Sequence, residues 1–212
     1  MIATTLLLHA QRLQALAQAG LTYTENAYDA ERYQEIRAIS VQLLHELTDN
    51  EPLEKLTQLF ASETGYQTPK VDVRAVLFRG SKEVLMVQEK IDGNRWTLPG
   101  GWADVGYTPF EVAVKEAHEE TGLVVRAVRL LALLDKKNHP HPPQPWYIYK
   151  AFVLCEVEGG RLLESTPETA GARWVREEEI SALPLSTDRN TASQLYTLFE
   201  FARNPQLPTL CD

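Results

Sequence analysis

The sequence predicts an α/β domain built on a mixed β-sheet and preceded by an N-terminal α-helical region. In the first 63 residues, apolar side chains recur at helical spacing, as Leu6, Ala10 and Leu13 do. From residue 70 onward they instead alternate with a period of two, as Val71 and Val73 do. Because the later strands are interrupted by helices, we expect a mixed sheet that is covered on both faces.

Turn and capping residues divide the chain into its expected elements. The first helix should end at Gly20 and the second near Thr48, and a third should follow to residue 63. A helical turn over residues 177–182 should precede a C-terminal helix, which Thr187 or Asp188 caps and which ends near Arg203. We expect strands over residues 71–77, 84–87, 96–98, 124–134, 146–157 and 172–175.

The 212 residues suit one ordinary domain with an appendage, or two small domains. The turn-rich stretch 64–69 separates the two patterns, so we predict a helical region over residues 1–66 and an α/β domain over residues 67–212. Three helices in about 60 residues have little core of their own. Their apolar faces need the rest of the chain or a second copy of it, and we predict a homodimer.

Composition narrows the class of protein. Apolar residues make up 44% and charged residues 24%, as in a globular protein, and the net charge is −8. This charge argues against broad binding to nucleic acid or acidic membranes. The two cysteines form no pair motif, and no apolar stretch reaches the length of a membrane span. We therefore expect a cytoplasmic protein that does not enter a membrane.

A short acidic helix is predicted from Pro109 to Thr121. Thr108 and Glu111 have the spacing of a capping box, Pro109 falls at the first helical position, and Gly122 is a natural stop. An apolar stripe formed by Phe110, Ala113, Val114 and Ala117 should face the core.

Three carboxylates gather beside this stripe. Glu116, Glu119 and Glu120 occupy positions i, i+3 and i+4 of the helix, where like charges repel. A solvated acidic face is one interpretation of this pattern. The favoured one is a cation site for Mg²⁺ or Mn²⁺, since these ions prefer oxygen ligands.

This region resembles the signature of the Nudix hydrolases. The residues in register with that signature are Gly101, Glu116, Ala117, Glu119, Glu120, Gly122 and Leu123. Two positions depart from it: Tyr107 stands where a glutamate is expected, and Lys115 stands where an arginine is expected. Lys115 keeps the positive charge but lacks the bidentate fork of arginine. The resemblance implies an α/β/α sandwich, which agrees with the mixed sheet expected from the sequence pattern.

The resemblance also implies a reaction and its residues. Nudix enzymes hydrolyse the pyrophosphate bond of a nucleoside diphosphate linked to a further group X, with the help of divalent metal. On this basis the metal ligands are the backbone carbonyl of Gly100 and the carboxylates of Glu116, Glu119 and Glu120. The catalytic candidates are Glu119, Glu120 and Glu168. Glu168 lies in a turn-rich loop, where a solvated charge is the alternative interpretation.

Residues 136–146 form an unusual loop rich in proline and histidine. With the Gly-Gly-Trp segment at residues 100–102 and the helical N-terminus, it resembles the Nudix subgroup that includes ADP-ribose and CDP-choline pyrophosphatases. The predicted substrate-binding residues are Trp102, Lys136, His139, His141 and Arg189. The alternatives are a plain surface loop or a structural zinc site for the histidines, and a core position for Trp102.

The leading functional hypothesis is therefore a Mg²⁺-dependent pyrophosphatase that acts on a nucleoside diphosphate linked to X and releases a nucleoside monophosphate and phosphorylated X. Alternatives are a house-cleaning nucleoside triphosphate pyrophosphatase, a non-catalytic nucleotide-sugar sensor, and a purely structural dimer module. The retained glutamates argue against the last two.

Overall fold

The computed structural model describes residues 2–48 and 52–212 and divides into two compact units. The first unit, Met1–Pro69 with Pro143–Tyr147, holds the N-terminal helices, and the second, Lys70–Pro142 with Ile148–Asp212, holds the sheets. Among the helices of the described residues, none combines the length and apolar character needed to cross a membrane.

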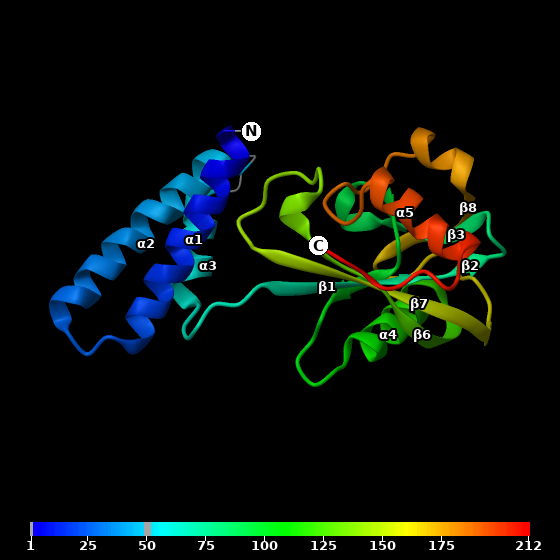
Figure 1. The fold of residues 1–212 in the computed structure, drawn as a ribbon, viewed down its shortest axis with the longest axis horizontal. Coiled ribbons are helices and arrows are strands. Elements are labelled where there is room, and N and C mark those ends of the chain that lie inside the picture. The colour runs from blue at the N-terminus through cyan, green and yellow to red at the C-terminus, as the bar shows by residue number, and fades with distance from the viewer. Residues whose placement is uncertain (1, 49–51) are drawn as a thin grey trace. The chain divides into compact units, whose positions relative to one another are not determined.

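The first unit is built from three helices (Figure 1), namely α1 (Ile2–Tyr23), α2 (Ala27–Leu47) and α3 (Leu53–Ser62). They share a small core formed by Ala10, Val41, Leu44, Leu56 and Phe60. The predicted end of the first helix at Gly20 is wrong, because α1 continues to Tyr23. A glycine inside a helix costs only about 1 kcal/mol relative to alanine, which the packing of α1 on α2 offsets.

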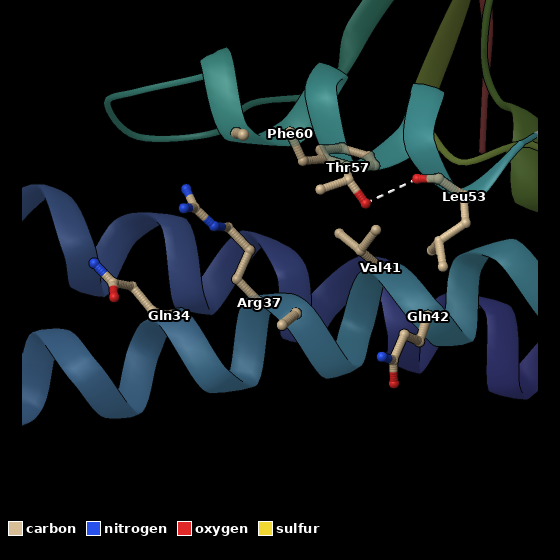
Figure 2. A pocket seen from close by; sticks show the side chains of 9 residues that line it. Gln34, Arg37, Val41, Gln42, Leu53, Thr57 and Phe60 are labelled. Carbon is tan, nitrogen blue, oxygen red and sulfur yellow. Dashed lines mark hydrogen bonds between the residues drawn. The ribbon is translucent and has the colours of Figure 1, made fainter.

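The helical unit exposes apolar side chains that its own core does not cover. Leu6, Leu13 and Leu16 of α1 are each between 38% and 47% exposed. A hollow of about 210 Å³ lies between α2 and α3, with Val41 and Phe60 among its lining residues (Figure 2). A helical unit of this size therefore leaves apolar surface available for another contact.

The second unit contains two sheets. The first has the order β5-β1-β7-β6-β9, and in the second β3 pairs with β2, β4 and β8. β1 runs parallel to β7, whereas β1 pairs with β5, and β6 with β7, in the antiparallel direction, so the sheet is mixed as predicted. The strands are β1 (Lys70–Val76), β2 (Phe78–Arg79), β3 (Glu83–Glu89), β4 (Arg95–Thr97), β5 (Gly100–Trp102), β6 (Leu123–Asp135), β7 (Ile148–Gly160), β8 (Thr169–Arg176) and β9 (Leu210–Cys211).

Two cores separate the layers of this unit. Ala113 and Ala117 of helix α4 (Pro109–Thr121) pack on one core, and Leu198 and Phe199 of helix α5 (Ala192–Arg203) pack on the other. Figure 1 shows the two helices on opposite sides of the strands. The arrangement is the expected α/β/α sandwich, and the predicted turn at Glu177–Ala182 is present as η3.

Two local predictions in this unit are wrong. Thr191, not Thr187 or Asp188, caps α5, since its hydroxyl accepts a hydrogen bond from the Gln194 amide. Phe110 is 38% exposed and does not join the buried stripe of α4. Val112 is buried instead, because the first turn of α4 presents this neighbouring position to the core.

A buried ion cluster joins β1 to β7. The carboxylate of Asp72 accepts hydrogen bonds from the Arg74 guanidinium, at 2.7 Å for the closest pair of atoms, and from the Lys150 ammonium. The three residues are at most 4% exposed. Burial alone would raise the pKa of Asp72, but the two cations hold it well below its usual range. The pairing is therefore needed to keep these charges inside the fold.

We expect Asp72→Asn to lower the free energy of unfolding by about 3–5 kcal/mol, since it leaves two buried cations without their shared carboxylate. Because the folded-state pKa of Asp72 lies below the unfolded value of about 3.9, its stabilisation is present at neutral pH and is lost as the pH falls below that value. Denaturant unfolding across this pH range measures both effects.

The control for this substitution is Asp29→Asn, which removes an exposed partner of Arg32 and should cost less than about 1 kcal/mol. The double variant Asp72→Asn/Lys150→Met should be more stable than Asp72→Asn alone, because one stranded cation is gone. Equal stability of the wild type and Asp72→Asn at neutral pH would show that the cluster does not stabilise the fold.

Candidate active site

The acidic helix forms where its sequence predicts it. Helix α4 spans Pro109–Thr121. Its capping box is complete, because the Thr108 amide donates to Glu111 Oε2 at 2.7 Å and the Glu111 amide donates to Thr108 Oγ1 at 3.3 Å. Gly122 ends the helix in the left-handed conformation, with φ of 77°. This fixed frame determines which glutamates point inward.

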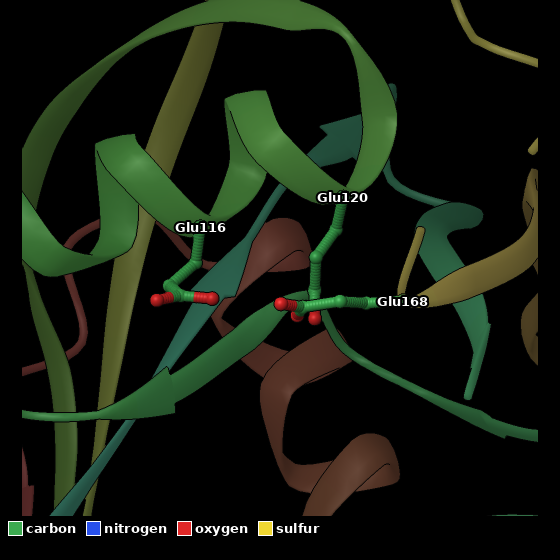
Figure 3. Close-up of side chains that lie close together, drawn as sticks. All are labelled: Glu116, Glu120 and Glu168. Carbon is green, nitrogen blue, oxygen red and sulfur yellow. The ribbon is translucent and has the colours of Figure 1, made fainter. Parts of the chain in front are cut away.

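Three carboxylates from two segments converge beside this helix. One oxygen of Glu116, one of Glu120 and one of Glu168 all lie within 4.8 Å of one another. Figure 3 shows Glu116 and Glu120 descending from α4 and Glu168 reaching toward them from the loop before β8. The two helix residues are 9% and 3% exposed, whereas Glu168 is exposed.

Hydrogen bonds fix the loop that carries Glu168. The Thr169 hydroxyl donates to the carbonyl oxygen of Glu120 at 3.0 Å, which ties the loop to the end of α4. Thr166 Oγ1 accepts from the amides of Glu168 and Thr169, at 3.3 and 3.0 Å. The amide of Lys90 also donates to the Glu168 carbonyl, at 3.0 Å. Glu168 therefore approaches α4 from a turn that several hydrogen bonds hold in place.

The two glycines of β5 allow the backbone to approach these carboxylates closely. The Gly100 amide donates to Glu120 Oε2 at 2.9 Å. Gly100 has φ of 150°, and a Cβ there would lie 2.1 Å from the Val73 carbonyl oxygen, so no other residue fits. A Cβ at Gly101 would lie 3.2 Å from the Glu116 carboxylate. The backbone of Gly100 and Gly101 thus lies directly against the carboxylates of Glu120 and Glu116.

The site concentrates negative charge away from water. Burial, together with the nearby Glu89 and Glu116 carboxylates, raises the pKa of Glu120 to about 8, against the opposing effects of the Arg74 guanidinium and the Gly100 amide. Burial also raises the pKa of Glu116, although Lys115 opposes that shift. Without an added cation, these carboxylates are therefore poorly compensated.

This donor set fits a divalent cation. It offers only carboxylate oxygens, which are acceptors that Mg²⁺ and Mn²⁺ prefer, and positive charge between them would relieve their repulsion. The exposed side of Glu168 leaves room for water or a substrate oxygen to complete the shell. The arrangement suits charge neutralisation at a phosphate.

Glu119 lies outside this group, which differs from the triad expected on one helix face. Its carboxylate, whose side chain is 55% exposed, pairs with Lys115 at 3.2 Å. Lys115 also contacts Glu116 at 3.2 Å and Asp104 at 3.9 Å. Glu119 therefore turns toward solvent, while Glu116 and Glu120 face the loop that carries Glu168.

The predicted substrate loop is anchored on both sides. Lys136 is 8% exposed, and its ammonium lies 3.9 Å from Asp188. Burial, together with the Lys150 ammonium, lowers the pKa of Lys136 to about 8. His139 Nε2 lies 2.7 Å from the carboxylate of Asp212.

His141 is engaged at both ring nitrogens. Its Nδ1 lies 2.6 Å from the Thr187 carbonyl oxygen, and its Nε2 lies 3.1 Å from the side-chain nitrogen of Gln194. Burial lowers the pKa of His141 to about 3, so its ring is neutral at neutral pH. His141 therefore brings no positive charge to the loop.

The remaining two predicted substrate residues have different surroundings. Trp102 is 49% exposed and so is not a core residue. Arg189 is paired inside the protein, with Glu89 at 3.2 Å and Asp92 at 3.7 Å.

The sequence pattern did not reveal the buried charges around the carboxylates. Asp72 and Arg74 alternate with apolar residues in β1, as side chains of a solvent-facing strand do, yet both are buried. Glu89 ends β3 and is 6% exposed. A signal was nevertheless present, since a strand covered on both faces leaves no solvent-exposed side for its charged residues.

Comparison with known proteins agrees with this geometry. Residues 68–199 match the NUDIX domain family, and residues 4–60 match a family described as a UDP-X-like, N-terminal oligomerisation domain. A protein of Bacillus subtilis (strain 168), named "Putative ADP-ribose pyrophosphatase YjhB", is 42% identical over 211 residues, which are 100% of this chain and 99% of that protein.

Two solved structures extend the similarity. The crystal structure of an ADP-ribose pyrophosphatase from Streptococcus suis 89-1591 is 38% identical, with a TM-score of 0.60, and covers 68% of this chain and 100% of its own. The crystal structure of a UDP-X diphosphatase is 28% identical, with a TM-score of 0.61, and covers 99% of both chains. This chain therefore belongs to the Nudix hydrolases, as an enzyme of the pyrophosphatase class that carries a UDP-X-like N-terminal oligomerisation domain.

Proposed function

We propose that this enzyme hydrolyses the pyrophosphate bond of a nucleoside diphosphate linked to X, with ADP-ribose as the first candidate and Mg²⁺ or Mn²⁺ as the cofactor. The observation that carries the proposal is the convergence of Glu116, Glu120 and Glu168 within 4.8 Å. The 42% identity to a protein named as an ADP-ribose pyrophosphatase, over the full chain, supports the choice of substrate.

The proposed reaction is a displacement at phosphorus. The oxygen of water forms a bond to one phosphorus, the bridging P–O bond breaks, and the bridging oxygen leaves with the other phosphate. With ADP-ribose the products are AMP and ribose 5-phosphate. A divalent cation held by Glu116 and Glu120 would supply positive charge to the phosphate oxygens and would lower the pKa of a water molecule.

The remaining roles, metal ligation and proton transfer, are assigned to residues of the chain. Glu116 and Glu120, fixed by α4, and the carbonyl of Gly100 are the proposed metal ligands. Glu168, which is exposed and comes from a separate loop, is the proposed third carboxylate ligand of the metal, and its second oxygen is the candidate to accept the proton of water. Glu119 is held by Lys115 at the edge of the group and is proposed to act through water.

The predicted loop residues have distinct proposed roles. Lys136 is the proposed phosphate contact of the loop, because it is a cation in a low-dielectric setting. His139 and His141 have ring nitrogens engaged by Asp212, Thr187 and Gln194, so we propose that they shape the loop. For Trp102, half of whose surface is free, we propose stacking on a base.

Arg189 is proposed to act indirectly. It contacts Glu89, the carboxylate that raises the pKa of Glu120, and so it balances charge beside the metal ligands. This role differs from the direct substrate contact expected from the sequence.

Other substrates remain as alternatives to ADP-ribose. CDP-choline has the same linked diphosphate, and nucleoside triphosphates contain the same bond. The N-terminal oligomerisation domain supports a linked nucleoside diphosphate over a triphosphate, since its family description refers to UDP-X. A non-catalytic sensor would not need the three converging carboxylates.

We further propose that the enzyme is a homodimer joined by its helical units. The exposed leucines of α1 occupy one side of that helix, and the family description of this region names oligomerisation. Burying such a stripe in a second copy would remove it from water.

Metal binding is expected to stabilise the wild-type protein. At a free Mn²⁺ concentration about 100 times Kd, the gain is roughly 2.7 kcal/mol, which should raise Tm by roughly 5–10 °C. Glu116→Gln, Glu120→Gln and Glu168→Gln should each reduce this shift more than Glu119→Gln does. Thermal unfolding with and without Mn²⁺ measures it, and a larger loss in Glu119→Gln than in the other three would contradict the proposed ligand set.

Glu120→Gln should lower kcat for ADP-ribose by roughly three orders of magnitude, because metal-ion catalysis supplies several kcal/mol of charge stabilisation. Product analysis with ADP-ribose, CDP-choline, ADP-glucose and a dNTP in Mg²⁺ and in Mn²⁺ measures activity and substrate choice. The matched control is Glu178→Gln, the same change at an exposed residue of η3. A folded Glu120→Gln variant with wild-type turnover would overturn the proposed function.

In sedimentation experiments at micromolar concentration the wild-type protein should be a dimer. Leu13→Glu places a charge in the exposed stripe of α1 and should shift the protein toward monomer. Arg12→Glu introduces the same carboxylate at the neighbouring exposed position and serves as the control. A monomeric wild type would rule out the dimer.

A further inference from the structure

The last strand of the chain lies beside the base of the substrate loop. β9 (Leu210–Cys211) pairs in parallel with β6, with Leu210 opposite Ala132 and Cys211 opposite Leu133. The Thr209 hydroxyl adds a hydrogen bond of 2.9 Å to the Leu130 carbonyl oxygen. This pairing brings the next residue, Asp212, to the point where β6 ends and the loop begins.

The carboxylate of Asp212 bridges both ends of the turn η2 (Lys136–Asn138). Its Oδ1 accepts a hydrogen bond of 2.7 Å from the amide of Asp135, which caps the start of the turn. Its Oδ2 lies 2.7 Å from Nε2 of His139, which caps the end. Partial burial would raise the pKa of Asp212, but these contacts and one from the Asn138 side chain lower it.

Local bonds help to hold the shape of the turn, among them the ion pair of Lys137 with Asp135 at 3.3 Å. Its backbone bond joins the His139 amide to the Lys136 carbonyl at 3.2 Å, and the Asp135 side chain accepts from the Lys137 amide at 3.1 Å. A 3₁₀ turn of three residues is weak by itself. The Asp212 carboxylate, which contacts both ends of the turn, therefore has a large influence on the conformation of the turn.

The conformation of this turn determines where two adjacent lysines point. Lys136 is directed inward and is 8% exposed, beside Asp188, whereas the Lys137 side chain is 41% exposed. Burial and the Lys150 ammonium disfavour the charge of Lys136, whereas the Asp188 carboxylate favours it, so the path of the turn backbone helps to set where this ammonium lies.

We propose that Asp212 is a positioning residue, which clamps η2 and so holds the Lys136 ammonium in place for a phosphate of the substrate. His139, which caps the end of the turn, provides the second contact of the Asp212 carboxylate. The substrate part of this inference rests on the proposed function, in which Lys136 contacts the linked nucleoside diphosphate. A pre-formed loop loses less conformational entropy on binding, so the clamp should act mainly on KM.

Two independent measurements test the clamp in the full-length protein. In Asp212→Ala, the Asp135 amide should exchange its hydrogen roughly tenfold faster or more, since it loses a hydrogen bond to a charged acceptor. KM for ADP-ribose should rise roughly fivefold, while kcat changes less than about twofold. Asp212→Asn keeps one acceptor oxygen, so its Asp135 exchange rate and its KM should both lie between those of the wild type and of Asp212→Ala.

The control is Cys211→Ser, an exposed side chain of the same strand whose change leaves the backbone pairing intact. It should match the wild type in both measurements. His139→Gln should also raise KM for ADP-ribose. The double variant His139→Gln/Asp212→Ala should have a KM close to that of Asp212→Ala, because both residues belong to one contact.

Unchanged exchange at Asp135 in Asp212→Ala would overturn the proposal, and so would faster exchange with an unchanged KM. These outcomes differ from failure of the proposed function, which is a wild-type protein that hydrolyses none of the linked nucleoside diphosphates. In that case the exchange rates alone decide whether Asp212 clamps the turn.

Discussion

The repulsion among carboxylates that are mostly buried is the constraint on which this catalytic domain depends. Glu116 and Glu120 are brought inward by α4, and Glu168 meets them from another loop. Such a group needs both a rigid frame and a compensating cation. The capping box supplies rigidity at one end of the helix, and the Thr169 hydroxyl ties the other end to the loop. The metal dependence of the Nudix family follows from the same electrostatic problem.

Charge compensation continues below the carboxylates. Arg74 lies close enough to Glu120 to oppose the rise in its pKa, and Asp72 in turn holds Arg74 and Lys150. Arg189 similarly contacts Glu89. Buried ion pairs of this kind are rarely the most stabilising way to fill a core. In this domain they contribute to the electrostatic field at Glu120, on which Arg74 and Glu89 act with opposite sign.

The two units have different tasks. The sheets carry the carboxylates, while the helical unit exposes an apolar stripe on α1 that suits its description as an oligomerisation domain. Within the sheet unit, the last strand adds a further constraint on the loop that begins at Lys136. The pairing of β9 with β6 thus brings Asp212 beside His139, a residue far from it in the sequence.

The sequence by itself determined the local features. Thr108, Pro109 and Gly122 fixed the bounds of α4, and the change from helical to strand spacing near residue 70 predicted an α/β domain after a helical region, because these signals depend on neighbouring residues. Spacing alone grouped Glu119 with Glu116 and Glu120 on the helix, whereas the fold brings Glu168 within 4.8 Å of Glu116 and Glu120 and pairs Glu119 with Lys115. Tertiary structure also decided that the charges of β1 are buried and that Asp212 lies beside His139. Such contacts join residues distant in the chain, and periodicity within one segment carries no information about them.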